Sequence, residues 1–385
     1  MAGDPIPAAR VGPAPSAAST VPSAEPTATP APPGAAPSAS AAPQAAPPVP
    51  PARPAAISLA SSAGDIDLAA GDDAFQRRDW GAAQAHYQAE LAAHAQSIPA
   101  LVGLARLRIA RLDLPIDYGS AKGSGSAKGS HGGGGNPEVV AASTQLLALT
   151  KRAPSFGPAF VELGRARLLL GDAPGALDAL QKGTSLLGDE PEAHSQLGIA
   201  FLATGRPDDA VRELARAAEL DPGSPARHGN LGTALLMLGR TKEAIAEYEA
   251  RVRLDDDDAR AHSDLGTALL GTEDLERAIA ELRRAVRIEP DRASFHSNLG
   301  FAFEQSGRLD WAVPEYREAL RRDPKLVSAW INLATALARN PKTRADARSA
   351  LDRAGVLSPG DPRVRANLDE LDALERLDGG APRSP

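Results

Sequence analysis

The stretch HSNLGFAFEQSGRLDWAVPEYREALRRDP, residues 296–324, contains the positions that decide the fold of this 385-residue chain. Its Leu299-Gly300 pair recurs at steps of 34 residues, in pairs that begin at Leu163, Leu197, Leu231 and Leu265. Thirteen residues after each repeat Leu stands an Ala, and four residues later a larger apolar residue: Leu180, Leu214, Tyr248, Leu282 and Tyr316. A fixed period of this length indicates a repeat architecture.

The spacing predicts two packed helices in each unit. A Gly beside the repeat Leu lets the first helix approach its partner closely, where the small Ala and the large residue one turn later form the matching face. A second Gly supplies the left-handed residue that ends the first helix, as at Gly171, Gly205, Gly239 and Gly307. Proline closes the second helix at Pro222, Pro290 and Pro324. Such a hairpin cannot bury its apolar face alone, so neighbouring units stack.

The pattern resembles the tetratricopeptide repeat (TPR) over most of residues 64–378. The resemblance implies an all-α superhelical solenoid of αα-hairpins. We expect two divergent N-terminal units in 64–156, six regular units in 157–361, a capping helix at 362–378 and a disordered tail at 379–385.

Two segments interrupt this pattern. The first 54 residues hold 16 Pro and 17 Ala, so we expect 1–56 to be a disordered tether that cannot bury enough apolar surface to fold. The run GSAKGSGSAKGSHGGGG, residues 119–135, lies in a Gly/Ser-rich insertion near 118–137. Its lysines precede Gly-Ser, and no strand comes before it, so a flexible insertion is favoured over a phosphate-binding loop.

Composition excludes several classes of function. The absence of Cys excludes thiol catalysis and thiolate zinc sites, and the net charge of -7 argues against a nucleic-acid partner. No run of eighteen apolar residues predicts a transmembrane segment. As written, the chain starts without a signal peptide, so a cytoplasmic location is expected. A different true start would allow a periplasmic or envelope-associated one.

The remaining polar clusters favour structural roles. His194, His228, His262 and His296 stand three residues before a repeat Leu, where Phe160 or Trp330 stands in flanking units. One His per hairpin is too widely spaced to bind a metal, so these residues are expected to pack. The run at 255–258 lacks the pattern of a calcium loop, so we interpret it as helix capping and solvation. The sequence predicts no enzyme activity, no metal and no cofactor.

The resemblance also implies a partner-binding groove lined by the first helices of the units. Carried onto this sequence, the groove positions are Arg165, Leu168, Ser195, Ile199, Leu202, Thr233, Leu236, Ser263, Thr267, Leu270, Phe301, Glu304, Asn332 and Thr335. The Lys and Arg residues that clamp a C-terminal carboxylate in some family members are missing at these positions, so that specificity is disfavoured.

The sequence therefore predicts a non-enzymatic scaffold that binds a protein or peptide partner in a small, hydroxylated and apolar groove. Two other functions stay open. One is an envelope-associated assembly factor of a bacterium, because Pro/Ala/Ser spacers follow signal peptides or lipid anchors in Ala- and Arg-rich proteomes. The other is a regulatory subunit of a separate enzyme. Oligomeric state and partner identity do not follow from the repeat.

Overall fold

A computed structural model describes residues 57–60, 65–112, 114 and 135–379, all within one compact unit, Val49–Pro385. The described residues form seventeen α-helices and one 3₁₀-helix, with no strand among them. The predicted tether and most of the Gly/Ser-rich insertion lie outside the described residues. No helix in the described part of the chain is long and apolar enough to cross a membrane.

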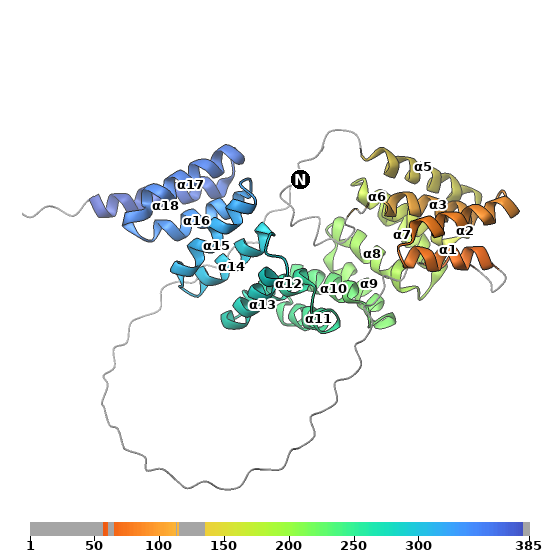
Figure 1. Ribbon diagram of the computed structural model, residues 1–385, viewed down its shortest axis with the longest axis horizontal. Helices are drawn as coiled ribbons and strands as arrows, with labels where there is room; N and C mark the ends of the chain where they lie inside the picture. The colour runs from red at the N-terminus through yellow and green to blue at the C-terminus, as the bar shows by residue number, and fades with distance from the viewer. Residues whose placement is uncertain (1–56, 61–64, 113, 115–134, 380–385) are drawn as a thin grey trace, which may run out of the picture. The chain divides into compact units, whose positions relative to one another are not determined.

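The helices follow one another as packed pairs, which Figure 1 shows in chain order. The first helices of the eight pairs are α1 (Ile66–Gln76), α3 (Ile98–Ala110), α6 (Gly157–Leu169), α8 (Pro191–Ala203), α10 (Pro225–Met237), α12 (Ala259–Leu269), α14 (Ala293–Gln305) and α16 (Val327–Ala338). Their partners are α2 (Trp80–Ala93), α5 (Pro137–Arg152), α7 (Ala173–Leu187), α9 (Pro207–Leu220), α11 (Thr241–Leu254), α13 (Leu275–Ile288), α15 (Leu309–Arg322) and α17 (Arg344–Leu357).

Two short elements complete the described fold. The 3₁₀-helix η1 (Pro341–Thr343) leads into α17, and α18 (Pro362–Gly379) packs on α16 and α17 at the C-terminal end. Each helix of a pair packs on its partner and on the adjoining helix of the next pair. The predicted class, an all-α stack of αα-hairpins, is confirmed.

The repeat glycines are required by close helix contact. A Cβ at Gly266 would lie 2.7 Å from Leu282 Cγ and 3.1 Å from the Ala278 carbonyl oxygen. At Gly232 it would lie 2.8 Å from a ring carbon of Tyr248. The large residue four positions after each repeat Ala therefore fills the space above the glycine, as the spacing predicts.

The turn glycines also adopt the predicted conformation. Gly171, Gly205, Gly239 and Gly307 have φ angles of 77°, 73°, 71° and 76°, in the left-handed region that favours glycine. Each ends the first helix of its unit and directs the chain into the second.

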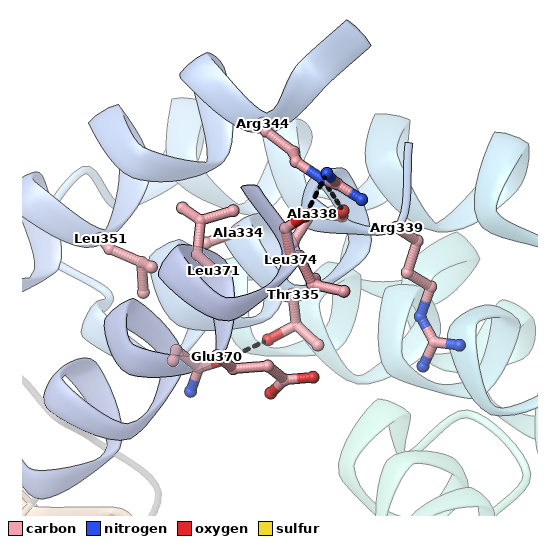
Figure 2. Close-up of a pocket in the computed structure, with 10 residues that line it drawn as sticks. Ala334, Thr335, Ala338, Arg339, Arg344, Leu351, Glu370, Leu371 and Leu374 are labelled. Atoms are coloured by element: carbon pink, nitrogen blue, oxygen red, sulfur yellow. Dashed lines mark hydrogen bonds between the residues drawn. The ribbon is translucent and has the colours of Figure 1, made fainter. Parts of the chain in front are cut away.

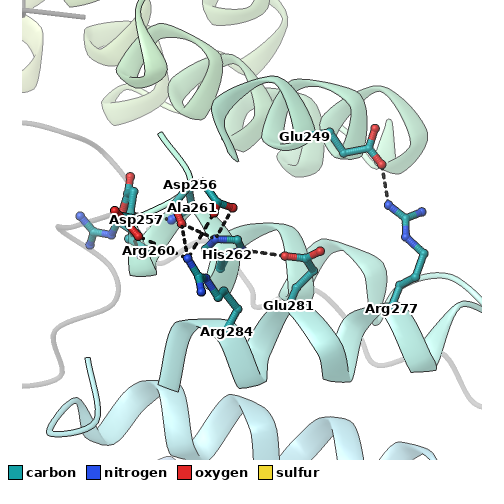
Figure 3. Close-up of polar contacts among 10 residues, drawn as sticks. Glu249, Asp256, Asp257, Arg260, Ala261, His262, Arg277, Glu281 and Arg284 are labelled. Carbon is teal, nitrogen blue, oxygen red and sulfur yellow. Dashed lines mark hydrogen bonds and ion pairs between the residues drawn. The ribbon is translucent and has the colours of Figure 1, made fainter. Parts of the chain in front are cut away.

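Each of the four periodic histidines connects three parts of its unit. In His194, His228, His262 and His296, Nδ1 lies 2.7 Å from a carboxylate oxygen of the Glu nineteen residues later, on the second helix. Nε2 lies 2.9–3.1 Å from the carbonyl oxygen six residues earlier, in the preceding loop. Figure 3 shows this arrangement around His262 and Glu281. The predicted structural role is thus based on hydrogen bonds as well as packing.

Protonation strengthens these contacts. A carbonyl oxygen and a carboxylate only accept, so both ring nitrogens donate when the imidazole is charged. Hydrogen bonding to Glu247 raises the pKa of His228, and hydrogen bonding to Glu315 raises the pKa of His296 in the same way. In the next unit Trp330 keeps half of the arrangement, because its Nε1 donates to the Pro324 carbonyl at 3.0 Å.

The acidic run at 255–258 caps a helix and joins units, as predicted. Asp258 accepts hydrogen bonds from the backbone N–H of Arg260 at 2.9 Å and of Ala261 at 3.2 Å, at the start of α12. Arg284 on α13 pairs with Asp256 at 3.2 Å (Figure 3).

Candidate partner-binding groove

The first helices place one equivalent residue from each unit along a common line, which we call the inner stripe. It consists of the residue that follows the repeat Gly, or the Ala in its place: Asp72, Arg106, Arg165, Ile199, Thr233, Thr267, Phe301 and Thr335. First helices of most adjacent units pack on each other, so equivalent positions face the same side. The stripe is charged in the first three units and uncharged in the rest.

The structure divides the fourteen predicted groove residues by exposure. Five are buried: Ser195, Ile199, Leu202, Ser263 and Glu304. Seven are half-buried: Arg165, Leu168, Thr233, Leu236, Leu270, Asn332 and Thr335. Thr267 is exposed, and Phe301 keeps 37% of its surface exposed, which makes it the most accessible large apolar side chain of the set. The groove therefore presents fewer apolar contacts than the register alone indicates.

Several predicted hydroxyl groups already bind within the chain. Thr233 donates to the Gly229 carbonyl at 2.9 Å and lies 3.1 Å from the Tyr248 hydroxyl. The Ser263 hydroxyl accepts a hydrogen bond from Asn298 Nδ2 at 3.2 Å. Thr267, in the middle of the stripe, therefore presents its hydroxyl most openly.

A polar cavity of about 210 Å³ lies beside this exposed part of the stripe. Residues of α12, α14 and the start of α16 line it, including Arg260, Ser263, Asp264, Arg292 and Asn298. Arg251 pairs with Asp264 at 2.8 Å, which fixes that carboxylate at the wall. The cavity can accept polar groups, while Phe301 on α14 offers an apolar contact.

Glu304 serves the interior of its unit. Tyr316 donates its hydroxyl to Glu304 Oε2 at 2.7 Å, and Arg339 lies 3.9 Å from Oε1. Burial raises the pKa of the Glu304 carboxyl. This side chain connects α14 to α15 and does not reach a partner in this conformation.

The C-terminal helix covers one end of the stripe. A cavity of about 410 Å³ lies between α16, α17 and α18, with Thr335 and Arg344 in its wall (Figure 2). Thr335 donates to Asn367 Oδ1 of α18 at 2.9 Å, and Arg344 donates to the Leu374 carbonyl at 3.0 Å. The stripe is therefore accessible mainly before α16.

At the opposite end, sequence reasoning missed a buried polar cluster. Asp72 of α1, Tyr87 of α2 and Arg106 of α3 bind one another and the short segment Ile57–Ala60. The available signal was their type, because charged residues stand at stripe positions that are uncharged in the later units.

Stacked hairpins with a shared groove, and no group of three or more His, Asp or Glu placed to hold a metal among the described residues, define a helical-repeat protein that acts by binding. Two family models described as the tetratricopeptide repeat match it, one at residues 167–231 and 201–265, the other at 263–326 and 298–362. These matches cover more than half of the chain, which therefore belongs to the tetratricopeptide repeat family. Its fold is that of a scaffold for protein–protein interaction.

Solved structures agree with this fold. The chain is similar to the APC/C hetero-tetramer Cut9–Hcn1, with a TM-score of 0.55, 17% identity, and coverage of 80% of this chain and 56% of that one. MamA from Desulfovibrio magneticus RS-1 covers 44% of this chain and 96% of its own, at 26% identity and a TM-score of 0.42. YrrB, titled a TPR protein with an unusual peptide-binding site, covers 48% and 95%, at 17% identity and a TM-score of 0.41. No curated protein matches the chain.

Proposed function

We propose that the chain is a non-enzymatic scaffold that binds a peptide segment of a protein partner along the inner stripe between α10 and α14. The observation that carries this proposal is Phe301, a large aromatic side chain that stays 37% exposed on the stripe. Aromatic side chains on a groove floor are typical anchors of an interface.

The surroundings of Phe301 suit a peptide with mixed character. Leu236 and Leu270 stand on the same helix face one and two units earlier, half-buried, where they can extend the apolar contact. The adjacent cavity, with Arg260 and Arg292 in its wall, supplies cationic hydrogen-bond donors. An apolar side chain flanked by acidic or carbonyl groups fits this combination.

Quantitative affinity purification from the source cells tests the proposal. The variant Leu236→Glu with Phe301→Glu places two charges on the stripe, and partners that bind there should be lost. The control Val356→Glu with Leu377→Glu adds the same charges at two exposed apolar positions outside the stripe, 69% and 75% exposed. Circular dichroism establishes that both variants stay folded.

Proteins retained by the wild type and the control, but depleted at least about tenfold by the stripe variant, support the proposal, because two hot-spot truncations typically cost more than 1 kcal/mol each. Equal retention by all three folded chains would show that the stripe is not the binding surface.

A further inference from the structure

The segment Ile57–Ala60 lies in the N-terminal end of the groove without belonging to any helix. Four residues, 61–64, separate it from the residue before α1. Ile57 and Leu59 are 3% and 1% exposed, whereas Ser58 between them is exposed. Alternate burial is the pattern of an extended chain on a surface. The segment therefore contacts the repeats as a bound peptide would.

Two charged side chains of the inner stripe recognise the backbone of this segment. Arg106 Nη1 donates to the Ile57 carbonyl at 2.8 Å. Asp72 Oδ2 accepts from the backbone N–H of Leu59 at 2.5 Å and of Ala60 at 3.3 Å. It also accepts from the Ser58 hydroxyl at 3.2 Å. Most of these contacts read main-chain atoms, so they can be made by another sequence.

The two charges are held in place from behind. Arg106 Nη2 donates to Asp72 Oδ1 and to the Tyr87 hydroxyl, and that hydroxyl donates to Asp72 Oδ1 at 2.9 Å. The Arg106 guanidinium also lies 4.4 Å from the ring centroid of Phe75. The Arg106 and Asp72 side chains are 0% and 7% exposed. A buried pair of charges needs further hydrogen bonds to offset desolvation, and the segment supplies them.

The apolar side chains of the segment enter two different clusters. Ile57 belongs to the cluster that includes Val161 and Leu180, and Leu59 belongs to the one that includes Leu68 and Leu107. Main-chain hydrogen bonds with separate apolar sites for alternate side chains are the features by which strand-like peptides are recognised. The site thus selects apolar residues at positions i and i+2.

We propose that this end of the groove is a binding site for an extended apolar–polar–apolar segment, and that residues 57–60 occupy it as an intramolecular ligand. A partner segment with the same pattern binds only by displacing them. The site uses α1, α2 and α3, so it does not depend on the function proposed for α10 to α14. The short connection to α1 gives the segment an effective concentration of about a millimolar or more, which a partner must overcome.

The test uses the full chain with Ile57→Asp and Leu59→Asp, which should release the segment. The probe is a fluorescently labelled peptide with the sequence of residues 54–61, PAAISLAS, followed by fluorescence polarisation. The released chain should bind it at least about tenfold more strongly than the wild type, because the intramolecular competitor is gone. A peptide with Asp at both apolar positions should not bind either chain.

Adding Arg106→Lys to the released chain separates specific from non-specific binding. Lys keeps the charge but cannot bond to Asp72, Tyr87 and a peptide carbonyl at once, so affinity should fall. Equal binding to wild-type and released chains, or no binding to a folded released chain, would overturn the proposal. Loss of helical circular dichroism on releasing the segment would also overturn it, because the segment would then be an integral part of the fold.

Discussion

The two ends of the repeat array use the same helix pairs but treat the inner stripe in opposite ways. In α1 and α3 the stripe residues are Asp72 and Arg106, which are buried and bound to residues 57–60. In α12 and α14 they are Thr267 and Phe301, which are exposed. The hairpin folds with either set, so the stripe is not what determines the fold. Its side chains are therefore available for recognition, which the chain itself satisfies at one end and leaves open at the other.

The two ends also differ in what stabilises them. The N-terminal units depend on one cluster built around a single ion pair. The regular units repeat two modest devices, the glycine contact and the His–Glu hydrogen bond, once in each hairpin. Loss of one contact should therefore be severe at the N-terminal end and mild in the middle.

The largest expected effect comes from Arg106→Ala. This change leaves the Asp72 carboxylate buried without its partner, and breaking a buried pair typically costs about 3–5 kcal/mol. Urea unfolding followed by circular dichroism should show an early transition for the N-terminal units. The control Arg108→Ala removes a half-exposed pair with Glu138, at 3.3 Å, and should cost less than about 1 kcal/mol. Similar losses for both variants would contradict the role given to Arg106.

Gly266→Ala should have the next largest effect. The added methyl meets Leu282 and the Ala278 carbonyl, and forced overpacking costs about 1–3 kcal/mol. Gly81 on α2 has only an Asp79 carboxylate oxygen within reach, at 3.6 Å, so Gly81→Ala should cause no loss of stability. Thermal unfolding of the two variants compares a packed and an unpacked glycine directly. A loss-free Gly266→Ala would mean that the helices can separate at little cost.

Raising the pH should weaken the regular units through His228 and His296. Their folded-state pKa values lie above the ordinary value of 6.5, so their stabilisation is complete below about pH 6.5 and is lost as pH rises through the folded values. We expect the free energy of unfolding to fall by roughly 1 kcal/mol between pH 6 and pH 9. Glu247→Gln with Glu315→Gln keeps the shape but removes the charges, and should reduce this slope. An unchanged slope would show that these pairs do not titrate as described.

The smallest effect should come from the surface between units. Arg277 on α13 lies 2.6 Å from Glu249 on α11 (Figure 3), and both side chains are partly exposed. Arg277→Ala should cost about 0.2–1 kcal/mol, and less in 1 M salt because exposed pairs are screened. Urea unfolding at two salt concentrations measures this. A loss above about 2 kcal/mol would contradict the view that the units are joined mainly by packing.

The sequence predicted the helix pairs, the two glycine positions and the cap at Asp258, because each depends on a local rule or a fixed spacing. Exposure along the groove could not be predicted in the same way. Ile199 and Thr267 share one register position, yet one is buried and the other exposed, because neighbouring units differ in the side chains they pack there.

The N-terminal cluster escaped prediction because its contacts have no period. Arg106 reaches Ile57 across 49 residues, and Asp72 reaches Leu59 across 13, in a part of the chain that the repeat frame did not include. The tether at 1–56, the insertion near 118–137 and the cellular compartment stay predictions.

Hydrogen–deuterium exchange of the Leu59 and Ala60 amides in the unmodified full chain tests the central claim most directly. If the groove is filled at its N-terminal end, both amides should exchange at least about tenfold more slowly than a free peptide of residues 54–61. That protection should disappear in Arg106→Ala. Exchange at the free-peptide rate in the wild type would show that the segment does not occupy the groove, and the contrast between a filled end and an open end would fail.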